Sequence, residues 1–218
     1  MNNEVMDYFG NPNIGLYVYT NNKYAIVSAA FSEDDVRKIA STLNVKVIQT
    51  TLAGTNLSGI FCVGNDNVLL LPNIVTEKEL KVLDDNEIKY EVINTKFTAL
   101  GNNMFCFNDI CFINQRMEAE VKEKLKKLFS KVIELTIATQ DNIGSMIALN
   151  SKGIAVNLNI TDDELSKIES ELKQNIEKLT VNSGNKFIRS GVVVNDNGLI
   201  VGDISTGVEM ADLYQLFK

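Results

Sequence analysis

Histidine and tryptophan are absent from this chain of 218 residues, which also contains only three cysteines and two prolines. Histidine is the side chain that most often acts as a general acid or base near neutral pH, and it is a common nitrogen ligand for metals. Its absence also excludes catalytic Ser–His and Cys–His pairs. The composition therefore argues against an enzyme, and we predict neither a metal site nor a cofactor.

Long hydrophobic runs are missing as well. No window approaches the roughly 18 consecutive apolar residues that a membrane span requires, and the start of the chain lacks the basic and apolar segments of a signal peptide. We therefore expect a cytoplasmic protein without a membrane partner. Because 45% of the residues are hydrophobic, the chain can still bury a substantial core.

The charge balance is acidic, with 28 acidic and 21 basic residues and a net charge of −7. A partner made only of RNA would be repelled at long range, whereas a basic protein surface would be attracted. The segment 118–131 alternates in sign, which favours a helix with a solvated face supported by pairs such as Glu118/Lys122. The alternative is an RNA contact through its lysines, Lys124, Lys126, Lys127 and Lys131.

One unit recurs five times along the chain. Polar turn clusters, each flanked by apolar strand-like runs, predict five β-hairpins. The turns are centred on Asn22, Asp66, Asp109, Ser151 and Asn197, at intervals of 44, 43, 42 and 46 residues. The regular interval indicates a repeat architecture.

A helix is predicted after each hairpin. Four capping-box patterns mark helix starts, at Ser32/Asp35, Thr76/Glu79, Thr161/Glu164 and Thr206/Glu209. In the fourth repeat the helical spacing runs from Leu165 through Ile176 to Leu179. A third strand is expected to close each of the first four repeats, at Lys46–Leu52, Ile88–Ile93, Val132–Ala138 and Leu179–Asn182.

The fifth repeat has no third strand of its own. Val5–Phe9 precedes Gly10 and Gly15 just as Gln49–Ala53 precedes Gly54 and Gly59. We therefore predict that the N-terminal strand completes the fifth repeat and closes a five-fold pseudosymmetric α/β ring. The ring is expected to be a single domain, with approximate repeats 10–52, 53–94, 95–138, 139–182, and 183–218 plus 1–9. A closed ring has no spare strand edge, which favours a monomer.

The three cysteines, Cys62, Cys106 and Cys111, stand among apolar residues, which predicts reduced, buried thiols. Two thiols without histidine or a further cysteine pair make a poor zinc site. Cys62 and Cys106 are 44 residues apart, a spacing that predicts equivalent core positions in successive repeats.

Asparagine and glycine crowd the segments that lead into each hairpin. Because these segments are equivalent in the repeat, we expect them to gather at one end of the ring and to form a docking face. Plain turn chemistry is the alternative explanation, since both residues tolerate positive φ. The candidate docking residues are Asn11, Asn13, Thr55, Asn56, Asn102, Asn103, Asn142 and Asn185.

The stretch from Leu52 to Leu80 resembles the translation initiation factor six family, the anti-association factors of the large ribosomal subunit in archaea and eukaryotes. The segments Ala53–Asn73 and Ala99–Asn102 are the most specific, and shorter matches extend over all five repeats. The resemblance implies the pentein fold, a propeller-like ring of five α/β units. That fold agrees with the repeats counted from the turns.

The resemblance also implies a function. A member of this family binds the large subunit on the surface that would otherwise meet the small subunit, acts by steric exclusion, and takes part in large-subunit maturation. We expect a basic ribosomal protein as the main partner, with some rRNA contact and no small-molecule substrate, and we expect Asn56 and Asn102 to matter most. The alternatives are a guanidino-modifying pentein enzyme, disfavoured by the missing histidine, and a permanent ribosomal component.

Overall fold

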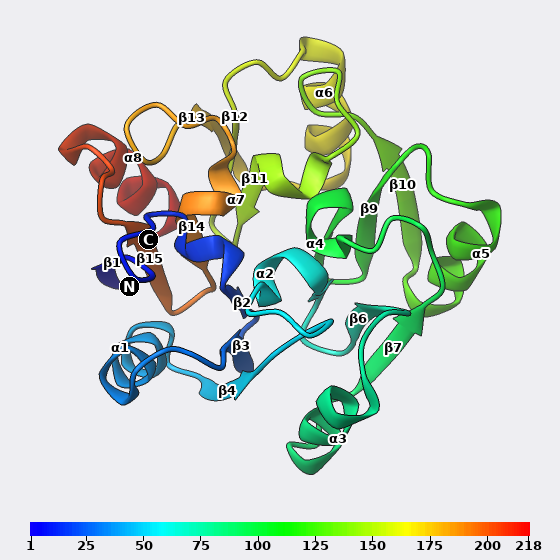
Figure 1. Ribbon diagram of the computed structural model, residues 1–218. Coiled ribbons are helices and arrows are strands. Elements are labelled where there is room, and N and C mark those ends of the chain that lie inside the picture. Colours follow the sequence, from blue (N-terminus) through cyan, green and yellow to red (C-terminus); the bar gives the residue numbers. More distant parts are fainter.

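The computed structural model describes residues 1–218, and its strands form five separate three-stranded sheets around a central axis (Figure 1). In the first four sheets an antiparallel hairpin is followed, after a helix, by a third strand parallel to the second. These sheets comprise β2 (Val18–Thr20), β3 (Tyr24–Ser28) and β4 (Lys46–Thr50); β5 (Val63–Gly64), β6 (Leu69–Pro72) and β7 (Tyr90–Ile93); β8 (Met104–Phe107), β9 (Ile110–Asn114) and β10 (Lys131–Leu135); and β11 (Ile147–Leu149), β12 (Gly153–Asn157) and β13 (Asn175–Leu179). We number the five units in this order.

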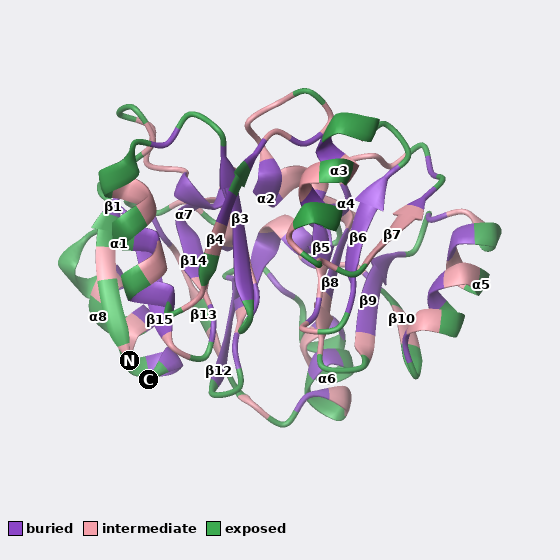
Figure 2. Cartoon of the chain, turned by 90° about the horizontal axis from the view of Figure 1, so that it is seen from below, coloured by how far each residue is buried: buried purple, intermediate pink, exposed green.

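The fifth sheet contains the N-terminal strand. Strand β1 (Asn2–Met6) pairs in parallel with β15 (Gly198–Gly202), whose other neighbour is β14 (Val192–Val194). The predicted closure of the ring is confirmed, and Figure 2 shows the two chain ends side by side. The strand begins and ends earlier than predicted, because Phe9 and Gly10 have φ values of 51° and 80° and turn the chain.

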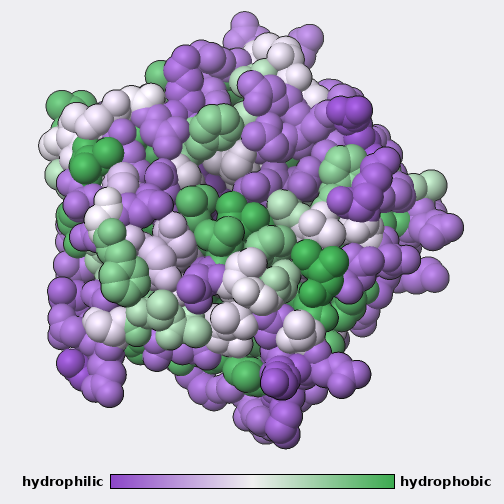
Figure 3. Space-filling model, viewed as in Figure 1, coloured by the Kyte–Doolittle hydropathy of each residue, from purple (hydrophilic) through white to green (hydrophobic).

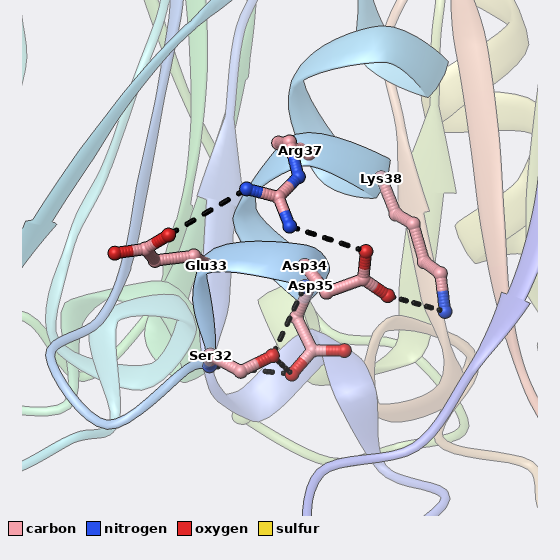
Figure 4. Close-up of polar contacts among 6 residues, drawn as sticks. All are labelled: Ser32, Glu33, Asp34, Asp35, Arg37 and Lys38. Atoms are coloured by element: carbon pink, nitrogen blue, oxygen red, sulfur yellow. Dashed lines mark hydrogen bonds and ion pairs between the residues drawn. The ribbon is translucent and has the colours of Figure 1, made fainter.

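One helix lies on the outside of each unit: α1 (Glu33–Leu43), α3 (Glu77–Asp85), α5 (Ala119–Leu128), α6 (Asp162–Glu171) and α8 (Gly207–Phe217). All four predicted capping boxes are present. Figure 4 shows the first, in which the Ser32 hydroxyl accepts from the Asp35 amide while the Asp35 carboxylate accepts from Ser32. None of these helices is long and apolar enough to cross a membrane.

Five short helical turns surround the axis, and the sequence analysis predicted none of them. These axial turns are η1 (Ile14–Leu16), α2 (Ser58–Phe61), α4 (Leu100–Asn103), η2 (Ile143–Met146) and α7 (Ile188–Gly191). Glycine allows the turns to pack backbone against backbone. A Cβ on Gly59 would lie only 1.9 Å from the carbonyl oxygen of Gly15, and one on Gly101 only 2.3 Å from that of Gly59.

The fourth unit departs from the predicted boundaries. Helix α6 ends at Glu171, and Ile176 and Leu179 lie in the closing strand β13 instead of continuing the helix. Their spacing is compatible with a helix. In the structure, however, β13 forms parallel backbone hydrogen bonds with β12, where Ile176 pairs with Ile154, and a longer helix could not form these bonds. The predicted closing strand Leu179–Asn182 therefore has the wrong bounds, since β13 begins at Asn175 and ends at Leu179.

Each of the five hydrophobic clusters is shared between two neighbouring units. One, for example, combines Val63 and Leu70 of unit 2 with Met104, Val121 and Leu125 of unit 3. Another combines Met6 and Ile200 of unit 5 with Ile14 and Ile39 of unit 1. No unit can bury its apolar face alone, as in other repeat proteins.

A ring of asparagine side chains joins the hairpin turns at one end of the axis, which we call the hairpin face. The side-chain amide of each donates to the backbone carbonyl oxygen of the next: Asn21 to Asn65, Asn65 to Asn108, Asn150 to Asn195, and Asn195 to Asn21. The joint between units 3 and 4 lacks this bond, because Phe107, which pairs with Ile110, stands at the equivalent position, and Asn108 is exposed in the turn that follows.

The cysteines differ from the prediction in part. Cys62 and Cys111 are fully buried and all three thiols are free, but Cys106 is only half-buried. Cys62 ends α2, whereas Cys106 lies within β8, with its Sγ 3.1 Å from that of Cys111. The two are not equivalent, since Cys62 stands three residues after its axial glycine, Gly59, whereas Cys106 stands five residues after Gly101.

The charged helix α5 pairs with neighbouring elements more than with itself. Lys122 lies 2.8 Å from Glu134 of β10, and Lys124 lies 3.0 Å from Glu91 of β7. The predicted pairs four residues apart are not formed, since the adjacent strands present acids within reach. The helix is therefore a salt-bridged outer surface.

Candidate docking face

The end of the ring opposite the hairpin face carries the predicted docking residues. We call it the loop face: it comprises the loops after the closing strands (7–13, 51–57, 94–99, 136–142 and 180–187), the axial turns and the amino ends of the outer helices. It is the face turned toward the reader in Figures 1 and 3. The prediction that these segments gather at one end is confirmed, and all eight candidate residues are half-buried there.

Asn11 and Asn13 build the first loop. The Asn11 side chain accepts from both the backbone and the side-chain nitrogen of Asn13, and donates to the Tyr17 hydroxyl at 2.9 Å. Asn182 donates to the carbonyl of Pro12 at 2.9 Å and so connects this loop to the loop at 180–187. Both candidates therefore have a structural role in the turn.

Four further candidates hydrogen-bond within their own loops. Thr55 donates to the carbonyl of Leu52, and Asn103 donates to that of Ala99. Asn142 donates to the Ser145 hydroxyl, and Asn185 donates to the Ser190 hydroxyl at 2.9 Å. For these residues turn chemistry accounts for the asparagine or threonine.

Asn56 and Asn102 differ from the other six. Their side chains make no hydrogen bond to any protein atom, although both are half-buried. Asn56 precedes axial turn α2, and Asn102 lies in the neighbouring turn α4. Each leaves an amide with two donors and a carbonyl acceptor for a partner.

Apolar side chains are also exposed on this face. Phe9 and Phe187 are 79% and 41% exposed, and Ile204 is 51% exposed. Figure 3 shows hydrophobic surface near the centre of the face, with mainly hydrophilic residues around it. An apolar centre with a polar rim is typical of protein–protein interfaces.

The rim of the loop face is mainly acidic. The outer helices begin there, and their first turns carry Glu33, Asp34, Glu77, Asp162 and Asp163, all exposed. Acids at these positions stabilise the positive ends of the helix dipoles. They also give the rim a negative potential that favours a basic partner.

Sequence reasoning missed how the capping glutamates hold the loops. Beyond its own helix, the Glu209 carboxylate accepts from the Thr180 hydroxyl at 2.7 Å and from the amides of Ser183 and Gly184. Glu79 binds the loop at 51–54 in the same way, and Glu164 binds the loop at 136–139. Each glutamate therefore fixes a loop of the preceding unit. The sequence feature that could have revealed these bonds is a threonine 28 or 29 residues before each glutamate.

Hydrogen bonding determines the ionisation of these carboxylates. Burial by itself would raise the pKa of Glu209, but the donors from Thr180, Thr206, Gly184 and Ser183 together lower that pKa to about 2. The same balance lowers the pKa values of Glu79 and Glu164. All three glutamates are charged when the loop face is formed at neutral pH.

A family model described as the eIF-6 family matches residues 3–216. The chain belongs to the eIF-6 family. Among the relatives of this eIF-6 chain is translation initiation factor 6 of Staphylothermus marinus, 38% identical over 212 residues that cover 93% of this chain and 91% of the relative. The factor of the same name from Sulfolobus acidocaldarius is 36% identical, with 96% of each chain covered, and that of Nanoarchaeum equitans is 31% identical with the same coverage.

A solved structure shares the fold of this eIF-6 chain. It is DDAH from Pseudomonas aeruginosa, a mutant complexed with citrulline, with a TM-score of 0.52 at 11% sequence identity, covering 81% of this chain and 71% of that one. The likeness supports the pentein architecture and nothing beyond the fold. The relatives of the chain are named as translation initiation factors.

Proposed function

We propose that this eIF-6 protein binds the large ribosomal subunit through the loop face and sterically prevents premature joining with the small subunit. The observation that carries the proposal is the pair of side-chain amides without a protein partner, Asn56 just before axial turn α2 and Asn102 in the neighbouring turn α4. Binding in this position also gives the protein a role in maturation of the large subunit, because a large subunit that carries the protein does not join the small subunit.

The chemistry of the loop face suits a basic ribosomal protein. Its exposed Phe9, Phe187 and Ile204 offer apolar area, and the acidic first turns of the outer helices surround it. Lys96 and Lys186 are exposed on the same face and provide contacts for rRNA at the edge of the interface. An interface between proteins therefore dominates in this proposal, with RNA in a secondary role.

Rigidity makes steric exclusion effective. A compact chain of this length has a radius of gyration of about 17 Å, and its five shared hydrophobic clusters prevent one unit from moving without its neighbours. A rigid protein of this size prevents other molecules from contacting the part of the subunit surface that it covers. No chemical step is needed.

Guanidino-modifying catalysis, known from pentein enzymes, is the rival. The chain contains no histidine to act as general acid or base. Burial raises the pKa values of Cys62 and Cys111, so neither is an activated thiolate. Incubation with arginine analogues provides the direct comparison, and release of ammonia or urea at enzymatic rates would favour the rival.

The test is sedimentation. Purified protein is mixed with large ribosomal subunits and sedimented through a sucrose gradient, and small subunits are then added. We expect co-sedimentation with the large subunit and loss of the joined particle. Reversible, sub-stoichiometric association identifies a factor, whereas constant one-to-one content in mature subunits identifies a permanent component.

Variants locate the interface. Asn56→Tyr and Asn102→Tyr place a bulky ring on the loop face and are expected to weaken subunit binding by about tenfold or more each. Asn67→Tyr is the matched control, since Asn67 is exposed on the hairpin face and its side chain makes no hydrogen bond. If all three variants bind the large subunit as tightly as the wild type does, the interface lies elsewhere.

A further inference from the structure

Arg189 occupies a position that glycine holds in the other four units. Gly15, Gly59, Gly101 and Gly144 each stand six or seven residues before the hairpin asparagine of their unit, and Arg189 stands six before Asn195. The structure confirms the equivalence, because a Cβ on Gly15 would lie 1.8 Å from the carbonyl oxygen of Arg189, just as one on Gly59 would lie 1.9 Å from that of Gly15. The axial turn α7, whose place is shown in Figure 1, therefore carries a long cationic side chain at a position where its counterparts have glycine.

This side chain borders a cavity on the axis of the ring. The cavity has a volume of about 630 Å³ and extends from the axial strands to the hairpin turns. Arg189, Tyr19, Phe105, Cys106 and Val193 are among the residues that line it. The volume lies within the roughly 300–1,000 Å³ that is usual for small-molecule sites.

The guanidinium of Arg189 has no partner in the protein. It forms no ion pair and donates no hydrogen bond, and the half-buried Arg189 side chain borders the cavity. Burial lowers the pKa of Arg189, and the groups that oppose this are the Tyr19 phenol and the Cys62 and Cys106 thiols, none of them a carboxylate. Arginine nevertheless stays protonated in proteins, and an uncompensated buried charge is costly.

A second polar group beside Arg189 is also unsatisfied. The Tyr19 hydroxyl is inaccessible to solvent and has no hydrogen-bond partner. Buried tyrosine hydroxyls usually have one. The Gln174 side-chain oxygen, which also lacks a hydrogen-bond partner, borders the same cavity. The ring of asparagine side chains around the cavity is open between Asn108 and Asn150.

We propose that the axial cavity is a binding site for a small phosphate-type oxyanion, anchored by the Arg189 guanidinium, and that the Tyr19 side chain, which lines the cavity, turns its buried hydroxyl toward the anion as a second donor. The planar fork of arginine matches two oxygens of such an anion and would form charge-assisted bonds with them. The bound charge compensates that of Arg189, and the Tyr19 hydroxyl gains its missing acceptor.

The hairpin face restricts which anions enter. Asp66, Asp109 and Asp196 stand at the cavity mouth beside a single lysine, Lys23. Their negative charge repels polyanions such as RNA, whereas a singly or doubly charged small ion passes with a smaller penalty. Free phosphate and the phosphate of a mononucleotide share the required chemistry, and both fit the volume.

The experiment is calorimetric titration of the full-length protein with inorganic phosphate and, separately, with adenosine monophosphate. Thermal unfolding in phosphate is compared with unfolding in sodium chloride at the same pH and ionic strength. We expect a Kd of about 1 mM or tighter and a higher Tm in phosphate than in chloride. Phosphate binding identifies the free ion as the ligand, and binding of the nucleotide alone identifies a nucleotide phosphate.

Variants assign the effect to the cavity. Arg189→Gly restores the residue of the other four units, and Arg189→Met keeps the side-chain volume without the charge. Both are expected to weaken binding by about tenfold or more, and Tyr19→Phe by about threefold to tenfold. Arg37→Gln, which removes an exposed arginine on α1, is the matched charge control and should bind like the wild type.

Two results would overturn the proposal. One is the absence of any heat or Tm difference between phosphate or nucleotide and chloride in the wild type. The other is binding that survives unchanged in both Arg189→Gly and Arg189→Met, since the anion would then lie elsewhere.

Discussion

The side-chain amide of Asn195 donates to the backbone carbonyl oxygen of Asn21 at 3.0 Å, across 174 residues of chain. It also donates to Leu43 at the end of α1 at 2.9 Å, while its oxygen accepts from the amides of Asn197 and Gly198. One buried side chain thus fixes its own hairpin and connects the last unit to the first.

Removal of this side chain should be costly. We expect Asn195→Ala to lower the free energy of unfolding by about 3 kcal/mol, because four backbone groups, bonded by three buried and one half-buried hydrogen bond, lose this partner. Denaturant unfolding measures the change. Asn108→Gly is the matched control, since the Asn108 side chain makes no hydrogen bond and its φ of 50° suits glycine, so its stability should differ little from that of the wild type.

The glutamates that bind the loops should make the loop face sensitive to acid. The folded pKa of Glu209, about 2, lies below the usual unfolded value, so its stabilisation is fully present above about pH 4.3 and is lost as the pH falls through the folded pKa. The lowered pKa values of Glu79 and Glu164 act in the same direction. Unfolding free energy measured between pH 7 and pH 2 should decrease mainly below pH 4.3.

Glu209→Gln isolates this effect. We expect a loss of about 2 kcal/mol at pH 7, because a neutral amide cannot replace a carboxylate that accepts from several donors, and a loss that shrinks toward pH 2. Asp35→Asn is the control, since Asp35 caps α1 but binds no loop of another unit, and its cost should stay below about 1 kcal/mol. Equal pH profiles for the two variants would contradict the prediction.

Close packing of the axial turns should make their glycines intolerant of substitution. Gly59→Ala places a Cβ 1.9 Å from a backbone oxygen, and we expect a loss of about 3 kcal/mol or more in unfolding free energy. Gly207→Ala is the control at the start of α8, where a Cβ meets nothing within 4 Å, and it should stabilise the protein slightly. Thermal unfolding of the two variants provides the comparison.

Ring closure depends on the N-terminal strand. Deletion of residues 1–9 removes β1, exposes the edge of β15 and opens the cluster that contains Met6, so we expect loss of cooperative unfolding and aggregation. Gel filtration and calorimetry report both effects. A synthetic peptide of residues 1–9 should partly restore cooperativity, and a deleted chain that unfolds like the wild type would disprove the dependence.

The loop face was only partly predictable from the sequence. Equivalent positions in the repeat placed all eight candidates at one end, but could not separate Asn56 and Asn102, with free amides, from Asn11 or Asn103, which hold their own turns. That difference depends on hydrogen-bond partners, which only the folded loops bring within reach. The bonds from Glu79 and Glu209 to a neighbouring unit were hidden for the same reason.

Local chemistry determined the repeat itself. Turn clusters and capping boxes such as Thr161/Glu164 depend on neighbouring residues, so the sequence alone predicted five units. It also predicted their closure, because Val5–Phe9 matches Gln49–Ala53 as a repeated pattern. Tertiary structure decided what depends on distant residues: whether Ile176 continues a helix or joins β12, which glycines meet around the axis, and where Arg189 extends. Backbone pairing and close packing between units are collective, and no local pattern specifies them.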